Sequence, residues 1–284
     1  MPLALPAAAL VLLAAAMHAS WNALVKGAAD RLLAMTLVAF WPMVPGFLAG
    51  LFVLPLPAPA SWPFLLGSMA THLAYYICLL NAYRYGDLSQ VYPLARGSAP
   101  VLVALLSALA AGEVLSWGGL AGVALVSLGT ASLAFERGRP RGDQGRSVLF
   151  ALLTALTITV YTVVDGLGVR RSGAPLGYIA WVFAIDGLPL LLISALVRGR
   201  AALPYVRSAW AIGAIGGLLA FASYGIAIWA MTLGAMAQVA ALRETGVIFA
   251  AMIGALFLRE PFGRRRILAA VVVAAGIILL QASR

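Results

Sequence analysis

Long apolar stretches alternate with short breaks, rich in glycine, proline or charge, along the whole chain. Each stretch has roughly the 20 residues that an α-helix needs to cross the hydrocarbon core of a bilayer. Backbone groups in lipid must be hydrogen-bonded within their own segment, so helices are the economical structure for these stretches. The pattern predicts an all-α membrane protein with ten transmembrane helices, at 3–26, 32–54, 62–83, 88–110, 117–135, 147–169, 176–197, 209–232, 236–258 and 265–282.

The longest charged connection falls near the middle of the chain. We therefore expect a first five-helix repeat at 1–136, a basic linker at 137–146 and a second five-helix repeat at 147–284. The remaining connections are tight, so the two halves should form one integrated membrane domain.

Two segments on either side of the linker resemble each other. Aligning 85–94 with 233–242 matches Gly86, Gln90, Val91 and Leu94 with Gly234, Gln238, Val239 and Leu242. A shift by one residue then pairs Arg96 with Arg243 and Glu113 with Glu260. Because five spans is an odd number, the second copy would enter the membrane upside down, as in inverted-repeat transporters. The alternative is chance similarity among helices rich in alanine and leucine.

The composition supports the same class. Apolar residues make up 63% of the 284 residues and charged residues only 10%, whereas soluble domains carry about 25% charged residues. The net charge of +10 does not indicate nucleic-acid binding, since basic and aromatic residues do not interleave on a polar surface. The single cysteine, Cys78, excludes an intrachain disulfide and a cysteine-based metal cluster.

The distribution of positive charge predicts an orientation. Fourteen of the 19 lysine and arginine residues lie in the odd-numbered connections, and positive residues stay cytoplasmic. Both termini should then lie outside a bacterial-type inner (plasma) membrane that the chain crosses many times. The first stretch lacks the positively charged start of a signal peptide, which favours an uncleaved span.

Several predicted spans carry polar and ionisable side chains on one helical face. Such groups cost at least about 2.5–3.5 kcal/mol each in a membrane and are expected to face a shared interior. The candidate substrate-binding residues are His18, Asn22, His72, Tyr76, Tyr83, Tyr92, Arg96, Tyr161, Asp165, Asp186, Tyr224, Gln238, Arg243 and Glu244.

These side chains suit an amino acid. Arg96 or Arg243 could hold a carboxylate, because the planar guanidinium matches carboxylate geometry. Asp165, Asp186 or Glu244 could hold the ammonium group, and the tyrosines the organic side chain. Equally, the two arginines could pair with Asp186 and Glu244 only to join helices.

Other chemistries lack their motifs. The chain has no glycine-rich loop ending in Gly-Lys-Ser/Thr for ATP. His18 and His72 have neither metal-ligand spacing nor carboxylates clustered with them in sequence. Neither Ser20 nor Ser89 lies in a nucleophile elbow. We therefore expect no enzymatic activity, no metal and no cofactor, and read the small-residue spacing of Gly213 and Gly217 as close helix packing.

Specific residues resemble a known family. They are the Trp21-Asn22 pair with Lys26 at the end of the first span, the Gly86-Asp87-Leu88-Ser89 entry to the fourth with Pro93 and Pro100, and the exits at Glu113 and Glu260. With its length and layout, the whole chain resembles EamA-type ten-helix exporters of the drug/metabolite transporter superfamily, bacterial aromatic and other amino-acid exporters among them. That resemblance implies a central cavity, peripheral fifth and tenth spans, and no soluble cofactor. Many such relatives place both termini in the cytoplasm, whereas the charge distribution of this chain predicts that both termini lie outside.

The predicted function is export of amino acids or related small metabolites by alternating access. Efflux of amphipathic cationic drugs is an alternative, because an acidic aromatic cavity suits cation–π contacts. An intramembrane lipid-handling enzyme is an alternative of another class. The predicted partners are a small-molecule substrate and the lipid bilayer, without nucleic acid, and no oligomeric state follows beyond a possible monomer.

Overall fold

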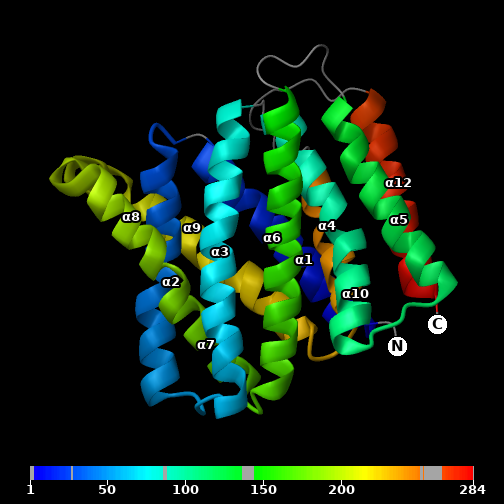
Figure 1. The fold of residues 1–284 in the computed structure, drawn as a ribbon, viewed down its shortest axis with the longest axis horizontal. Helices are drawn as coiled ribbons and strands as arrows, with labels where there is room; N and C mark the ends of the chain where they lie inside the picture. Colours follow the sequence, from blue (N-terminus) through cyan, green and yellow to red (C-terminus); the bar gives the residue numbers. More distant parts are fainter. Residues whose placement is uncertain are drawn as a thin grey trace.

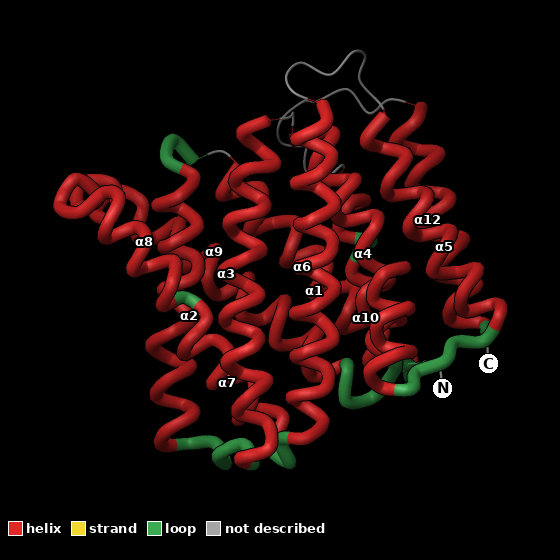
Figure 2. The backbone as a smooth tube through the Cα atoms, viewed as in Figure 1, coloured by secondary structure: helices red, strands yellow, loops and turns green. Residues whose placement is uncertain are grey.

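The computed structural model describes residues 3–26, 28–85, 88–135, 144–249, 252 and 264–283. Within this part every regular element is a helix (Figures 1 and 2). The elements of the first half are α1 (Leu5–Lys26), α2 (Arg31–Phe52), η1 (Pro59–Ser61), α3 (Trp62–Tyr85), α4 (Leu88–Ala111), α5 (Trp117–Ser132) and η2 (Leu133–Phe135). Those of the second half are α6 (Gln144–Arg171), α7 (Pro175–Asp186), α8 (Leu188–Arg198), η3 (Gly199–Ala202), α9 (Leu203–Ala230), α10 (Met236–Arg243) and α12 (Arg264–Ala282).

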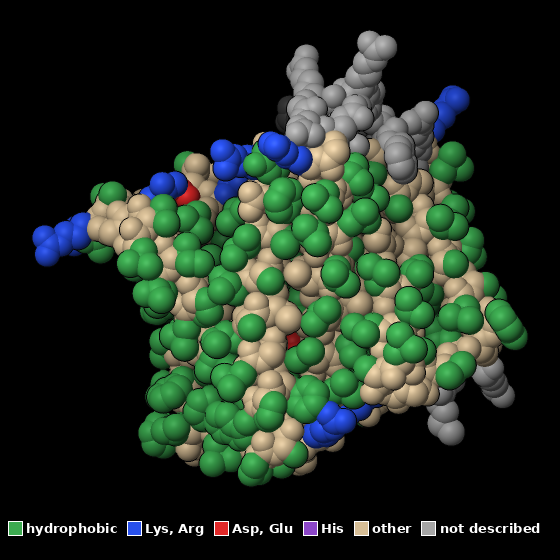
Figure 3. All heavy atoms as spheres, viewed as in Figure 1, with side chains coloured by type: hydrophobic (Ala, Val, Ile, Leu, Met, Phe, Trp, Pro, Cys, Tyr) green, Lys and Arg blue, Asp and Glu red, His purple; other side chains and the backbone are tan. Residues whose placement is uncertain are grey.

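The helices have the composition of membrane spans. Six described segments are long and apolar enough to cross a bilayer, and α5 and the last helix add two shorter apolar ones. Large apolar side chains such as Leu109, Leu196 and Leu218 are mostly exposed. In Figure 3 hydrophobic side chains cover a broad middle belt, while lysine and arginine gather near two opposite edges. The structure confirms the predicted all-helical fold class for the described residues.

The two halves interleave. α3 packs on α6, α1 and α2 both pack on α9, α4 packs on α6 and α10, and α5 packs on α12. Close approach depends on glycine at several of these contacts: a Cβ on Gly213 would lie 2.7 Å from Leu37, and one on Gly217 would lie 2.7 Å from Trp41. The expected packing role of this glycine pair is confirmed.

Two helices predicted as continuous are interrupted. The span expected at 176–197 divides at Gly187, with Asp186 ending α7 and α8 beginning at Leu188. The span expected at 236–258 has a turn at 244–245 after α10, and helix resumes at 246–249. Pro189 in the first turn of α8 lacks an N–H group, which explains why a helix starts there. Each interruption holds an acidic residue: Asp186 is the last residue of α7, and Glu244 lies in the turn after α10.

Candidate functional site

A buried ion pair joins α4 of the first half to the turn that follows α10 in the second. The Arg96 guanidinium Nη2 lies 2.9 Å from Oε1 of Glu244, and the two side chains are only 5% and 3% exposed. Arg96 Nε and Glu244 Oε2 are buried without a hydrogen-bond partner in the described structure. An ion pair of this kind is costly unless further polar contacts complete it. The pair therefore has unused capacity for hydrogen bonds.

Asp165, on α6, is fully buried and is surrounded by hydroxyl groups. Tyr178 donates a hydrogen bond to its Oδ1 at 3.1 Å, and Tyr224 donates one to its Oδ2. Ser68 on α3 also lies within hydrogen-bonding reach. The two tyrosine hydroxyl groups partly compensate the loss of water around this carboxylate.

Arg243 extends this group toward the ion pair. Its guanidinium carbon lies 5.1 Å from the centroid of the Tyr224 ring, over the ring face. The Tyr224 hydroxyl donates to Asp165, so one tyrosine lies between a cation and a carboxylate. Arg243 Nε is also buried without a hydrogen-bond partner.

His72 and Asp186 form a second charged group between α3 and the end of α7. His72 Nδ1 lies 3.3 Å from Asp186 Oδ1, and also contacts the Ser68 backbone oxygen at 3.0 Å. The Tyr76 hydroxyl reaches Asp186 Oδ2 only at 3.5 Å, a distance at which a hydrogen bond is weak. Asp186 is therefore less well compensated than Asp165.

Aromatic rings line the space around these charges. Tyr161 stacks on His72 with ring centroids 4.2 Å apart. Tyr224 meets both rings edge to face, and Tyr75 meets Tyr161 in the same way. Tyrosine combines apolar area with a polar tip, which suits the wall of a site for an organic ion.

The remaining predicted residues are placed less centrally. His18 on α1 meets Trp21 edge to face and is electrostatically close to both arginines, while Tyr92 on α4 is close to the Arg96–Glu244 pair. Asn22 donates to the backbone oxygen of His18 at 2.8 Å, with no bond to the charged groups.

Gln238 bonds elsewhere, since it accepts from the Leu3 N–H and donates to Gln281. Tyr83 lies on α3, and its side chain is outside the part that the structure describes. Glu260, the expected repeat partner of Glu113, is outside the described residues.

Three residues join the site that were not among the candidates: Ser68, Tyr75 and Tyr178. Ser68 lies one helical turn before His72, and Tyr75 lies three residues after it, so both follow from the α3 face. Tyr178 shares a helical face with Asp186, but it bonds Asp165 on the neighbouring helix. Sequence spacing alone could not assign that partner.

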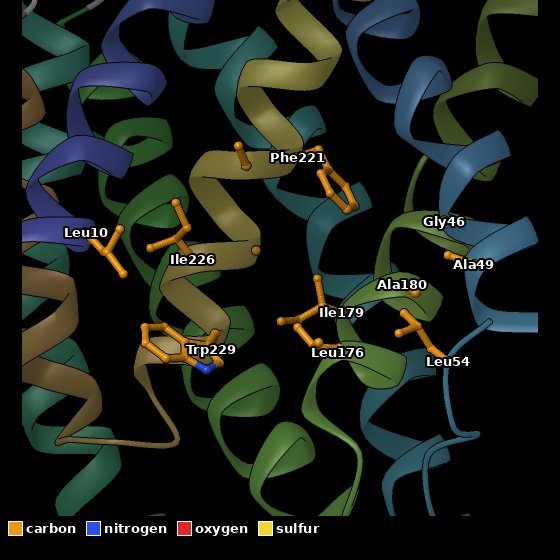
Figure 4. Close-up of a pocket in the computed structure, with 12 residues that line it drawn as sticks. Leu10, Gly46, Ala49, Leu54, Leu176, Ile179, Ala180, Phe221, Ile226 and Trp229 are labelled. Atoms are coloured by element: carbon orange, nitrogen blue, oxygen red, sulfur yellow. The ribbon is translucent and has the colours of Figure 1, made fainter. Parts of the chain in front are cut away.

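Within the described residues, no three His, Cys, Asp or Glu side chains come together as metal ligands would. A separate cavity of about 390 Å³ lies away from the charges, among apolar residues of α1, α2, α7 and α9 (Figure 4). Its lining includes Leu10, Leu176, Phe221 and Trp229. Among the described residues, no charged side chain lines this cavity, so the polar site is the one that can recognise a ligand by its charge.

Comparison with known families decides the class of protein. A family model described as the EamA-like transporter family matches the chain twice, over residues 5–135 and 145–281. The chain belongs to this family. EamA-like proteins are membrane transporters of small molecules, not enzymes, and the predicted resemblance is confirmed. The two matches also confirm that this EamA-like chain consists of two repeats.

A solved structure supports the fold of this EamA-like chain. A protein of known crystal structure aligns over 98% of both chains with a TM-score of 0.76 and 18% sequence identity. At that identity the likeness shows a shared fold alone. A search of curated proteins gave no match.

Proposed function

We propose that this EamA-like chain exports amino acids or related small metabolites across a bacterial-type inner membrane. In the proposed architecture ten spans form two inverted five-helix repeats, at 1–136 and 147–284, which alternate in opening the central site to either side. The proposed orientation places both termini outside, because most positive residues lie in the connections at the other surface.

One observation carries the proposal: buried charged side chains in the centre keep unpaired polar atoms. Arg96 Nε, Arg243 Nε and Glu244 Oε2 have no hydrogen-bond partner in the described structure. An unsatisfied buried polar group costs about 1–3 kcal/mol, and more when charged. A zwitterion supplies a carboxylate for the guanidinium groups and an ammonium for Glu244, so its binding would satisfy all three.

The surrounding rings support an organic side chain on that zwitterion. Tyr75, Tyr161 and Tyr224 present edges and faces around His72. Such a wall would accept apolar or aromatic groups with little rearrangement. The site therefore favours an amino acid over an inorganic ion.

Efflux of an amphipathic cation is the second candidate function. Three carboxylates, Asp165, Asp186 and Glu244, face only two arginines in this site, and aromatic faces attract organic cations. A cation lacking a carboxylate would leave the arginine Nε atoms unpaired, which is why we rank it second.

The test is transport of a panel of labelled amino acids, with one aromatic quaternary cation, by the purified protein in proteoliposomes. Arg96→Gln and Arg243→Gln should weaken substrate binding by about 2–5 kcal/mol, or roughly thirty-fold or more in apparent affinity. Arg198→Gln is the matched control, because Arg198 pairs with Asp30 at an exposed helix end.

Unfolding in detergent, measured on the same variants, separates the alternatives. An arginine that only joins helices would lower stability without a selective loss of affinity. If both variants fold and transport every compound as the wild type does, the proposed substrate site is wrong.

A further inference from the structure

The charges at the centre of the molecule do not balance. Among the described residues, five formally charged side chains meet there: Arg96, Asp165, Asp186, Arg243 and Glu244. With every acid ionised and the histidines neutral, the cluster holds one negative charge in excess. A low-dielectric interior makes such an excess costly, so the cluster favours binding one cation.

The contacts show where that excess lies. Glu244 is paired with Arg96 at 2.9 Å. Asp165 is bonded by Tyr178 and Tyr224, and the Tyr224 ring lies under Arg243. Asp186 accepts one long hydrogen bond, from Tyr76 at 3.5 Å, and its Oδ1 accepts none. The uncompensated carboxylate is therefore that of Asp186.

The neighbour of that carboxylate is a group that can carry a proton. His72 Nδ1 lies 3.3 Å from Asp186 Oδ1, a separation that one proton can bridge with little movement. The Asp186 side chain is 14% exposed and the His72 side chain 9%, compared with 5% and 3% for Arg96 and Glu244. The pair is thus more accessible than the Arg96–Glu244 pair. Asp186 is also the last residue of α7, so its side chain can move relative to His72 without breaking a helix.

We infer that His72 and Asp186 form a proton-binding site that holds one exchangeable proton and restores the charge balance of the central cluster. Water delivers the proton to the Asp186–His72 pair from one side and removes it on the other, with no other bond formed or broken. The coupling of this proton to export rests on the function proposed above, whereas the binding of the proton does not.

The groups that face this pair set its proton affinity. The pair is in contact with Ser68 and Tyr76 on α3, Tyr161 on α6 and Tyr224 on α9, and His72 also senses the charges of Asp165 and Arg243. The other titratable groups of the cluster act through these neighbours: Tyr75 on α3, Tyr178 on α7 beside Asp165, and His18 on α1, Tyr92 and Arg96 on α4, and Glu244 after α10. Neighbouring negative charges raise the affinity of the pair for a proton, and the positive arginines lower it. Removing the Asp165 charge should therefore shift proton release to lower pH without abolishing it.

The first experiment detects the proton without a substrate. Infrared difference spectra of the purified protein are recorded over about pH 5 to 8, the range in which such groups exchange protons. The wild type should show a titrating carboxyl signal that is lost in Asp186→Asn and kept in Asp186→Glu. Asp165→Asn should keep the signal but move it to lower pH. Glu113→Gln, which removes a carboxylate at the end of the bundle, should leave it unchanged.

A signal that persists in Asp186→Asn, or is absent from the wild type, overturns the inference. Where Asp186→Asn does not fold, His72→Gln provides the second test: its titration must move from the wild-type position, and an unmoved titration overturns the inference.

The second experiment measures coupling in proteoliposomes with labelled amino acids. An imposed pH gradient should change the flux of the wild type, and the fluxes of Asp186→Asn with and without the gradient should be equal. A titrating Asp186 in a protein that moves no amino acid would overturn the proposed function and leave the proton site standing. Amino-acid flux that ignores the gradient in the wild type would overturn the coupling alone.

Discussion

Gly168 has no side chain at the point where the Tyr178 hydroxyl passes α6 on its way to Asp165. A Cβ at this position would overlap the hydroxyl and would lie 2.6 Å from the Tyr178 Cζ and 2.7 Å from the Phe64 Cβ. The hydroxyl is the flexible neighbour, whereas the Phe64 Cβ is fixed to its own backbone. The hydrogen bond that holds the Asp165 carboxylate therefore depends on an empty position one helical turn away.

Gly168→Ala should displace Tyr178 and lower stability by about 1–3 kcal/mol, as overpacking of a dense interior does. Thermal unfolding in detergent measures the loss. Gly67→Ala is the matched control, because its Cβ would meet only Val164 at the ordinary distance of 3.5 Å. Equal stability of the two variants would contradict the close packing described for Gly168.

The ends of several helices are joined by a single arginine. Arg170, at the end of α6, pairs with Glu113 beyond α4, and donates to the backbone oxygens of Met231 at 2.7 Å and Gly234 at 2.8 Å. Glu113 also accepts from the Met236 N–H at 2.9 Å. Glu113 belongs to the first half and the other four residues to the second, so this contact closes one end of the bundle between the halves.

A double-mutant cycle with Arg170→Gln and Glu113→Gln should give a coupling energy of about 1 kcal/mol in detergent unfolding, near the upper end for partly exposed ion pairs. The comparison pair is Asp30–Arg198, which is more exposed, with side chains 24% and 44% accessible. Its coupling should be smaller, because Arg198 lacks the two backbone acceptors. A larger coupling for the comparison pair would contradict the argument.

The sequence predicted helix positions well and helix interruptions poorly. Observed helices such as α3 and α4 begin where the apolar stretches begin, because the bilayer fixes both length and composition. The break at Gly187 was missed because glycine and proline are common inside membrane helices and the apolar pattern continues through it. The turn after Arg243 was missed because Arg243 and Glu244 were interpreted as polar side chains on one continuous helix.

The sequence predicted that several polar side chains lie inside the bundle, but not how they pair. Helical spacing identified His72, Asp165 and Asp186 as inward-facing, because lipid would not accept them. Partner choice depends on how helices rotate against one another, which spacing within one helix does not determine. Asp186 accordingly lies beside His72, and Arg96 bonds Glu244.

On the scale of the whole molecule, the two surfaces differ in charge. The N- and C-terminal ends lie at one edge of the bundle, and the ends of α3 and α8 that carry Arg84 and Arg198 lie at the other (Figure 1). Arg170 and Arg171 end α6 at the edge of the termini. Insertion machinery retains positive connections on the cytoplasmic side, so the asymmetry bears on orientation.

Single cysteines placed in a Cys78→Ala background test that orientation. Positions 2 and 283 should react with an impermeant thiol reagent in intact cells, and positions in the 136–146 linker should react only after lysis. Equal total labelling after lysis is the control for expression. The reverse pattern would place the termini in the cytoplasm.

The contact between α5 and α12 sets a limit on how the halves can move. A Cβ on Gly122 would lie 2.8 Å from the Gly276 oxygen, and one on Gly276 would lie 2.8 Å from the Gly122 oxygen, so backbone faces backbone there. Such a contact resists sliding, since one turn of shift would bring larger side chains into a gap that holds none. In the proposed alternating access, the α5–α12 contact would serve as the pivot between the halves, and the largest displacement would fall on α2 and α8 at the opposite edge of the bundle (Figure 1).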